Sequence, residues 1–158
     1  LDFSMFWQVV AKRDLWLDGP MFWGISGGEW QSTGLKEHLD YYRPENTTSV
    51  FGPNTNAYFP KMYMSKDMNQ KVQTRYLQNG AYARLKNIQL GYTFPTQIIN
   101  KLHMQKLRVY VSAENVLTIT SLPSGFDPET TYSSYSDGNS GKTYPLQTTI
   151  SFGLHATF

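Results

Sequence analysis

Aromatic side chains are frequent in one long stretch that is rich in Gly, Pro and Asn, residues 14–75. Flat aromatic faces stack on the apolar faces of sugar rings, so Trp and Tyr in loops are residue types suited to binding a carbohydrate. The same side chains could instead pack on one another, because a loop of 62 residues needs a core of its own. The residues that we single out for contact with a ligand or a partner protein are Trp23, Trp30, Tyr41, Tyr42 and Tyr58.

A second stretch nearly matches a phosphate-binding loop. Residues 136–143 read SDGNSGKT, but Ser136 stands where such a loop has its first glycine. Tyr144 and Pro145 follow directly and prevent the helix that a phosphate-binding loop requires. We therefore expect an ordinary turn here.

The remaining ionisable side chains predict no catalytic or metal site. His38, His103 and His155 lie in three different parts of the chain and lack the spacing of metal ligands. Asp127 and Glu129 flank a proline, as they would in a structural loop turn, and no nucleophile lies nearby. We expect no enzyme activity, no bound metal and no other cofactor.

The composition excludes several partners and anchors. The chain has 158 residues, a formal net charge of +2 and no cysteine, so it has neither a basic field for nucleic acid nor a disulfide framework. Only 16% of the residues are charged, against roughly 25% in an ordinary soluble domain. No apolar run of about 18 residues occurs, which excludes a transmembrane helix but not strands that cross a membrane with alternating apolar and polar residues.

Alternation of apolar and polar residues dominates four windows, and each window predicts a β-strand with two unlike faces. A bulge near Leu85 would explain a slip in the alternation of the second window. A short helix is expected from Thr96 to Leu102, after Pro95 at its start. The four windows are 1–13, 81–94, 107–119 and 146–158.

The third window separates apolar from polar residues most clearly between the two faces of its predicted strand. Its apolar face carries Leu107, Val109, Val111 and Ala113. In a barrel this face would contact lipid, and the other face would line the lumen. The lumen-facing candidates are Arg108, Tyr110 and Glu114.

The lengths of the connections indicate an outer-membrane barrel. If the strands are antiparallel neighbours and the C-terminus is periplasmic, the long loops 14–75 and 120–145 lie outside the cell, and the short turn 95–106 lies in the periplasm. A strand of 13 residues with a tilt of about 40° rises about 33 Å, enough to cross an apolar band near 25 Å. Four strands cannot close a barrel, so we expect an all-β segment that preceding sequence or other chains complete.

Several motifs, in order along the chain, resemble the SusC/RagA-type TonB-dependent outer-membrane transporters of Bacteroidota. Residues 82–95 read YARLKNIQLGYTFP, similar to that family's YLRLKNITLGYTLP, and residues 107–118 read LRVYVSAENVLT, similar to LRVYVSGQNLFT. Residues 125–129, GFDPE, resemble its GYDPE loop. Residues 32–45 and 56–60, STGLKEHLDYYRPE and NAYFP, resemble members that import glycans. One departure is Glu114, where Gln is commoner.

This resemblance implies the C-terminal part of a plugged barrel of about 22 strands that imports a nutrient, mostly oligosaccharides and sometimes peptides. It implies a SusD-like surface lipoprotein, the TonB complex and a second transporter–lipoprotein pair as partners. The plug and the TonB box would lie before Leu1, which we take for the start of a fragment or a processed chain. Phe158, an aromatic residue at the end of the last strand, resembles the signal that the barrel-assembly machinery recognises.

A different class of protein has the same sequence features. A soluble β-sandwich, such as a carbohydrate-binding or adhesin module, also has alternating strands and aromatic loops. In a sandwich the apolar faces meet in a dry core, whereas in a barrel they face lipid. The environment of the apolar faces therefore separates the two interpretations.

Overall fold

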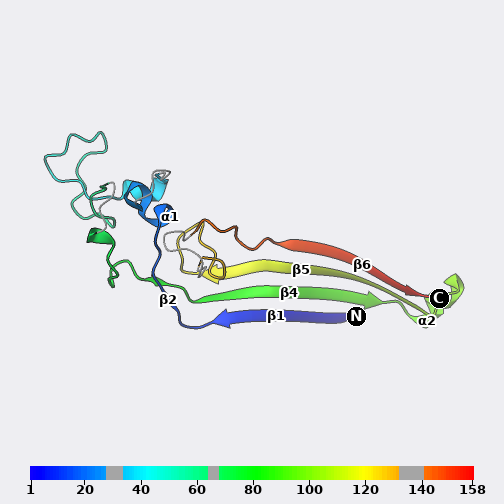
Figure 1. The fold of residues 1–158 in the computed structure, drawn as a ribbon. Helices are drawn as coiled ribbons and strands as arrows, with labels where there is room; N and C mark the ends of the chain where they lie inside the picture. The colour runs from blue at the N-terminus through cyan, green and yellow to red at the C-terminus, as the bar shows by residue number, and fades with distance from the viewer. Residues whose placement is uncertain (28–33, 64–67, 132–140) are drawn as a thin grey trace. The chain divides into compact units, whose positions relative to one another are not determined.

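The computed structural model describes residues 1–27, 34–63, 68–131 and 141–158 (Figure 1). The chain divides into two compact units. We call Leu1–Arg13, Gly80–Ser121 and Leu146–Phe158 the sheet unit, and Asp14–Asn79 with Leu122–Pro145 the loop unit.

Four antiparallel strands make up the sheet unit. They are β1 (Asp2–Val10), β4 (Tyr82–Thr93), β5 (Lys106–Thr120) and β6 (Thr149–Thr157), in the order β1-β4-β5-β6. Each of the four alternating windows overlaps one of these strands, with β5 extending one residue beyond its window at each end, and Figure 1 shows the strands side by side. The chain is thus mostly β-structure, as the alternation predicted.

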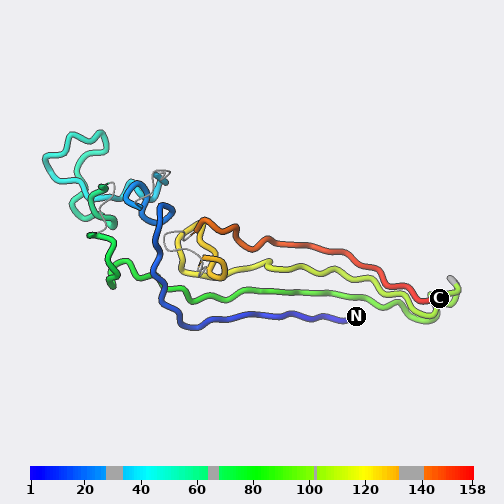
Figure 2. Tube along the Cα trace, in the orientation of Figure 1, coloured from blue at the N-terminus to red at the C-terminus, as the bar shows by residue number. Residues whose placement is uncertain are grey.

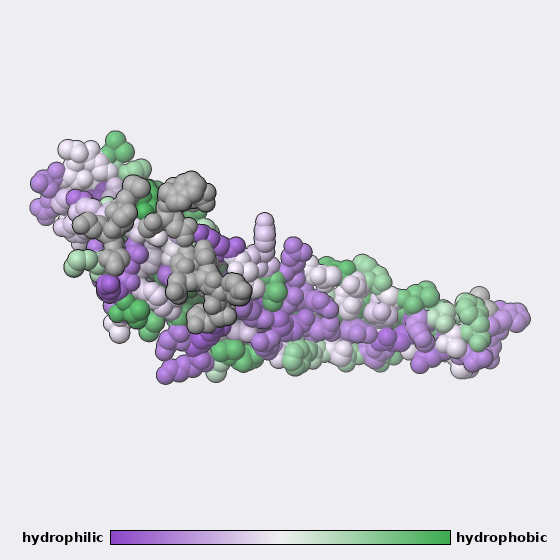
Figure 3. Space-filling model, in the orientation of Figure 1, coloured by the Kyte–Doolittle hydropathy of each residue, from purple (hydrophilic) through white to green (hydrophobic). Residues whose placement is uncertain are grey.

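The register gives the sheet one apolar and one polar face. Phe3, Leu90, Val111 and Phe152 form one row across the strands, and the next row is Ser4, Gln89, Ser112 and Ser151. Because successive side chains of a strand point to opposite sides, the first row belongs to the apolar face and the second to the polar face. In Figure 3 hydrophilic side chains run along the visible face of the sheet, and hydrophobic ones emerge at its margins.

The apolar face is exposed on its two outer strands, β1 and β6. Phe3 is 59% exposed and Phe152 84% exposed, although both belong to the side chains that proteins most often bury. No second sheet packs on this face within the described part of the sheet unit. The exposed face is what a lipid-facing sheet requires and differs from the dry core of a β-sandwich.

A bulge interrupts β4 at the predicted place. The pairing with β1 and with β5 shifts between Leu85 and Asn87, so Lys86 has no direct partner position. Beyond the shift, Trp7, Leu85 and Leu117 form a new row on the apolar side. The extra residue therefore preserves the two faces where the strict alternation of β4 fails.

A compact turn connects β4 to β5. It contains the short helix α2 (Thr96–Ile99) and the 3-10 turn η4 (Asn100–Leu102), so the helix expected after Pro95 is confirmed. Ile99 is buried and His103 ends the turn in the left-handed conformation, at φ 56°. The amide of Gln105 donates to the carbonyl of Thr157, which brings the turn beside the end of β6 (Figure 2).

The described residues of the loop unit form only short elements. They are β2 (Asp14–Leu15), α1 (Pro20–Trp23), η1 (Gly24–Gly27), η2 (Lys36–Leu39), η3 (Met68–Gln70) and β3 (Gln78–Asn79), with β2 paired to β3. Helix α1 begins at Pro20, where a missing N–H costs nothing, and stops at Gly24, whose φ of 60° suits glycine. No helix among the described residues is long and apolar enough to span a membrane.

Candidate functional site

An aromatic core holds the loop unit together. Trp23 lies at its centre, with ring centroids 5.2 Å from Phe22, 6.3 Å from Phe59 and 4.9 Å from Tyr76, all near edge-to-face. The indole N–H of Trp23 donates to the carbonyl of Leu17 at 3.0 Å, so the buried polar atom is satisfied. The core residues are Leu15, Leu17, Phe22, Trp23, Phe59, Tyr76, Leu122 and Phe126.

His38 is part of this packing. The amide of Leu35 donates to Nδ1 of His38 at 2.8 Å, and Nε2 lies 3.1 Å from the carbonyl of Phe22. Nδ1 must therefore be the unprotonated nitrogen and Nε2 the donor. Both nitrogens are used within the fold, and the described residues contain no cluster of three metal-ligating side chains.

Arg43 organises the segment that precedes Phe59. Its guanidinium is buried, with Nε donating to the carbonyl of Gly52 at 2.6 Å and Nη1 to that of Leu39 at 2.7 Å. The group also lies over the ring of Tyr41, 4.7 Å from the centroid. The guanidinium thus bonds to the carbonyls at both ends of the segment from Leu39 to Gly52 and also packs on an aromatic ring. These contacts fix the backbone of that segment.

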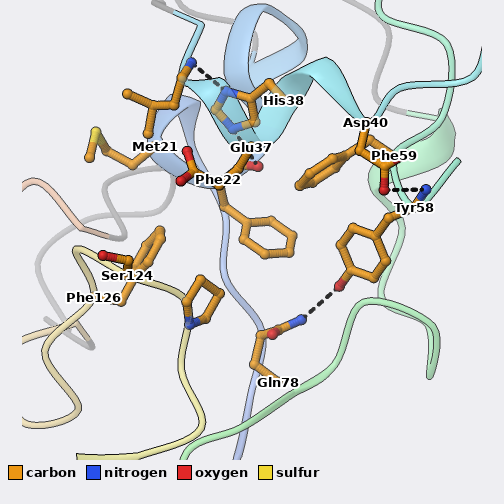
Figure 4. A pocket seen from close by; sticks show the side chains of 12 residues that line it. Met21, Phe22, Glu37, His38, Asp40, Tyr58, Phe59, Gln78, Ser124 and Phe126 are labelled. Carbon is orange, nitrogen blue, oxygen red and sulfur yellow. Dashed lines mark hydrogen bonds between the residues drawn. The ribbon is translucent and has the colours of Figure 1, made fainter.

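A pocket of about 540 Å3 opens against the aromatic core (Figure 4). This volume is typical of sites for small ligands. The buried rings of Phe22, Phe59 and Phe126 contribute to its lining. The other lining residues are Met21, Leu35, Glu37, His38, Asp40, Tyr58, Gln78, Pro123 and Ser124.

The polar groups of the pocket come from opposite sides. Glu37 and Asp40 lie on one side of the view in Figure 4, and Gln78 lies on the other. Asp40 accepts hydrogen bonds from Asn54 Nδ2 at 2.8 Å and from the amide of Tyr58 at 3.1 Å. Gln78 donates to the hydroxyl of Tyr58 at 3.0 Å. The lining thus combines apolar side chains with two carboxylates and includes neither Lys nor Arg.

The aromatic candidates from the sequence occupy different environments. Trp23 is buried, 2% exposed, and Trp30 lies outside the described residues. Tyr41 and Tyr58 are half-buried against the core, and Tyr58 also lines the pocket. Tyr42 is 40% exposed. Tyr58 and Tyr42 therefore have faces available to a ligand or partner, whereas the position of Trp23 is that of a core residue.

The three lumen candidates lie together on the polar face of β5. Arg108 forms an ion pair with Asp2 of β1, with 2.5 Å between Nη2 and Oδ2, and its guanidinium lies 5.0 Å from the ring centroid of Tyr110. Glu114 lies further along β5, in register with Asn87 and Thr149. Asp2 was missed as a partner of Arg108, because the two are 106 positions apart and only the strand order brings them together.

Two glycines give this cluster its space. Asp2, Gly91, Tyr110 and Gly153 form one row across the four strands. A Cβ on Gly91 would lie 2.5 Å from Arg108 Nη2, and a Cβ on Gly153 would overlap the ring of Tyr110. The ion pair and the ring thus lie directly on the backbone of these two glycines. A larger residue at either position would displace them.

The other candidate residues have structural surroundings. Asp127 accepts from the amide of Glu129 at 2.8 Å, and the amide of Thr131 donates to the carbonyl of Asp127. This is the turn expected around Pro128. Phe158 follows β6 and is 76% exposed. Most of the stretch that resembles a phosphate-binding loop, residues 136–140, lies outside the described residues.

The sequence matches no family model. It is 34% identical over 112 residues to TonB-dependent receptor P3 of Formosa agariphila, a match that covers 66% of this chain and 11% of that protein. TonB-dependent receptor P26 of the same organism is 24% identical over 164 residues, covering 100% of this chain and 16% of that protein. The chain thus spans only a small part of the length of these relatives.

Solved structures share the fold over nearly the whole chain. A structure of the RagAB peptide transporter has a TM-score of 0.65 and 23% identity, covering 99% of this chain and 16% of that one. The RagAB peptide importer in its open-open state has a TM-score of 0.62 and 22% identity, covering 99% of this chain and 15% of that one. At this identity the likeness shows a common fold.

Proposed function

We propose that this chain, a segment of a SusC/RagA-type TonB-dependent receptor, forms C-terminal strands of a plugged barrel that imports a nutrient across the bacterial outer membrane. The relatives confirm the resemblance that the sequence motifs indicated and place the protein in the outer membrane. They are receptors and transporters, and we propose no enzyme activity for this chain.

The exposed apolar face of the sheet is the observation that carries the proposal. Rows such as Phe3, Leu90, Val111 and Phe152 would face lipid, and the opposite rows would face the lumen. The lumen is where Arg108, Tyr110 and Glu114 would bond to the plug. The complete barrel would have about 22 strands, with the loop unit on the extracellular side.

The partners follow from the same proposal. A SusD-like surface lipoprotein would lie over the extracellular loops, and the TonB complex would act on a part of the protein that precedes this chain. Exposed loop residues such as Tyr42 would contact the lipoprotein or the substrate. Two transporter–lipoprotein pairs would associate as a dimer. Phe158 would serve as the signal for barrel assembly.

We propose an oligosaccharide as the substrate, supported by the aromatic loop side chains and by the likeness of residues 32–45 and 56–60 to glycan importers. Tyr58 combines an accessible ring with a place at the pocket, which suits stacking on a sugar. A peptide is the second candidate. It is favoured by the apolar lining of the pocket and by the fold shared with a peptide importer.

The test uses the full-length protein that carries this sequence, expressed in cells with and without TonB. We expect a band in the outer membrane whose mobility changes on heating, copurification of a lipoprotein, and uptake of a labelled oligosaccharide only when TonB is present. Tyr42→Ala should reduce uptake, whereas the matched control Tyr144→Ala, at a loop tyrosine that is 89% exposed, should not. A soluble band, or uptake that does not need TonB, would contradict the proposal, and a soluble monomer would favour the β-sandwich module.

A further inference from the structure

A groove of about 300 Å3 lies on the apolar face of the sheet unit, over β4, β5 and β6. Val109 and Val111 of β5 form its floor, and each valine pairs with a longer side chain, Tyr92 of β4 or Phe152 of β6. The two valines follow each other along β5, so the groove runs parallel to the strand and fits an extended hydrocarbon chain. The other lining residues are Leu1, Leu90, Gly91 and Tyr110.

The groove offers a hydrocarbon chain more contacts than a flat surface does. In the proposed barrel lipid surrounds this face, so apolar area alone gives a bound chain no advantage over the bilayer. A chain that lies on the two valines also touches the sides of Tyr92 and Phe152, and these small attractions add up. The groove therefore favours a bound acyl chain, whatever headgroup that chain carries.

An aromatic pair marks the end of the groove that is nearer to the turn between β4 and β5. Tyr92 and Phe94 pack edge-to-face, with ring centroids 5.0 Å apart. The hydroxyl of Tyr92 makes no hydrogen bond with another described residue. Since aromatic rings with a polar tip are typical of the level where lipid headgroups begin, this hydroxyl is placed to donate to the ester or phosphate oxygens of a phospholipid.

The turn itself carries positive charge. Lys101 in η4 and Lys106 at the start of β5 are exposed, and neither side chain makes a hydrogen bond or an ion pair with another described residue. Residues 95–106 include neither Asp nor Glu. Lys106 begins its strand at the membrane boundary, where the long side chain can extend to a headgroup.

The carboxylates of the sheet unit do not neutralise these two lysines. The unit has seven Lys and Arg residues but only two acidic residues, Asp2 and Glu114. Asp2 is already paired with Arg108, and Glu114 lies well inside β5. A terminal carboxylate at Phe158, beside the strand partner of Lys106, would offset only one of the two charges. The turn thus attracts an anion.

We infer that the groove and the turn together bind one anionic phospholipid of the periplasmic leaflet, with an acyl chain along the two valines and the phosphate beside Lys101 and Lys106. Lys106 lies three residues before Val109, about 10 Å along a strand. The glycerol phosphate and the reach of a lysine side chain cover this distance together. A zwitterionic lipid binds less well, because the lysines repel its ammonium group. The inference deepens the proposed function, since it rests on this face contacting lipid and on the turn lying in the periplasm.

The test measures, by native mass spectrometry, the affinity of the purified full-length protein in detergent for phosphatidylglycerol and for phosphatidylcholine. We expect phosphatidylglycerol to bind up to about thirtyfold more tightly, at about fivefold for each lysine. Lys101→Gln should lower the affinity for phosphatidylglycerol about fivefold and leave that for phosphatidylcholine unchanged. The matched control is Lys12→Gln, an exposed lysine after β1 at the opposite end of the sheet, which should change neither affinity.

A second variant tests the groove and keeps the charge. Val111→Phe fills the floor of the groove without removing a core residue. We expect it to weaken both lipids about threefold, the effect of losing a handful of carbon contacts, and to leave their ratio unchanged. The control Ile119→Phe adds the same bulk to the apolar face of β5 at a residue that is 59% exposed and does not line the groove, and should change neither affinity.

Equal affinity for the two lipids, an unchanged affinity in Lys101→Gln, or equal effects of Val111→Phe and Ile119→Phe would each overturn the inference. So would a dimer that Val111→Phe separates, because a second copy would then occupy this face. The location of the protein and its uptake in cells separate this failure from that of the proposed function. If the protein remains in the outer membrane and uptake still needs TonB, the barrel stands and the lipid site does not.

Discussion

Gly153→Ala should destabilise the sheet more than the same change at Gly91, although the two glycines lie in one row of the polar face. At Gly153 the new Cβ would overlap the ring of Tyr110, which must leave its place over the backbone. Overpacking of this kind costs about 1–3 kcal/mol. The displaced ring also leaves the guanidinium of Arg108, now 5.0 Å from its centroid.

At Gly91 the new Cβ would meet the ends of two flexible side chains. It would lie 2.5 Å from Arg108 Nη2 and 2.6 Å from Asp2 Oδ2, and both groups can move toward solvent. The side chains of Arg108 and Asp2 are 24% and 52% exposed, so weakening their ion pair costs little. Replacing glycine in a strand also reduces the backbone entropy lost on folding. We expect Gly91→Ala to leave stability nearly unchanged.

The assay is a double-mutant cycle on the full-length protein in detergent, read as the temperature at which the folded band disappears from an unheated gel. We expect Gly153→Ala to lower this temperature, and Gly153→Ala in a Tyr110→Ala background to have no further effect, because the overlapping ring is gone. Equal effects of Gly153→Ala with and without Tyr110 would refute the argument. So would a larger effect at Gly91.

Three further changes test other parts of the structure. Ala113→Arg, on the apolar face at the middle of β5, should cost about 2–4 kcal/mol, measured by the same gel assay, whereas Ser112→Arg on the polar face should be tolerated. Arg43→Lys should lose at least one of the bonds to the carbonyls of Leu39 and Gly52, at roughly 2 kcal/mol, and limited proteolysis should then cut residues 44–53 faster. Asn115→Ala should cost about 1–2 kcal/mol, because Asn115 has a φ of 52° and donates to the carbonyl of Gln147. Asn115→Gly, which keeps the backbone conformation, should cost less in the gel assay.

The strands of the sheet could be predicted from the sequence, because the residues of each strand show the alternation by themselves. Alternation assigns Val109 and Arg108 to opposite faces without knowledge of any partner strand. The slip at Leu85 marks the bulge for the same reason, since one extra residue reverses the alternation. Pro95 marks the start of the short helix, where its fixed φ fits.

The packing of the loop unit could not be predicted from the sequence in the same way, because it depends on residues that are distant in the sequence. Trp23 and Tyr42 look alike as loop aromatics, and only the fold makes the first a core residue and the second an exposed one. The buried Arg43 was missed, since no local pattern distinguishes a guanidinium that binds carbonyls from a solvated one. The pocket joins Met21 to Phe126 and has no signature in any single segment.

The measurement that tests the central claim most directly is a cysteine scan of β5 in the full-length protein in outer membranes. A spin label is attached to a single cysteine at each position from Leu107 to Glu114. The collision rate of the label is measured with oxygen, which partitions into lipid, and with a nickel complex, which stays in water. We predict an oscillation of period two, with oxygen reaching the odd positions such as Val109 and Val111 and nickel reaching the even ones. Low access of both reagents at Val109 and Val111 would mean that these side chains lie in a dry protein core, and would contradict the barrel.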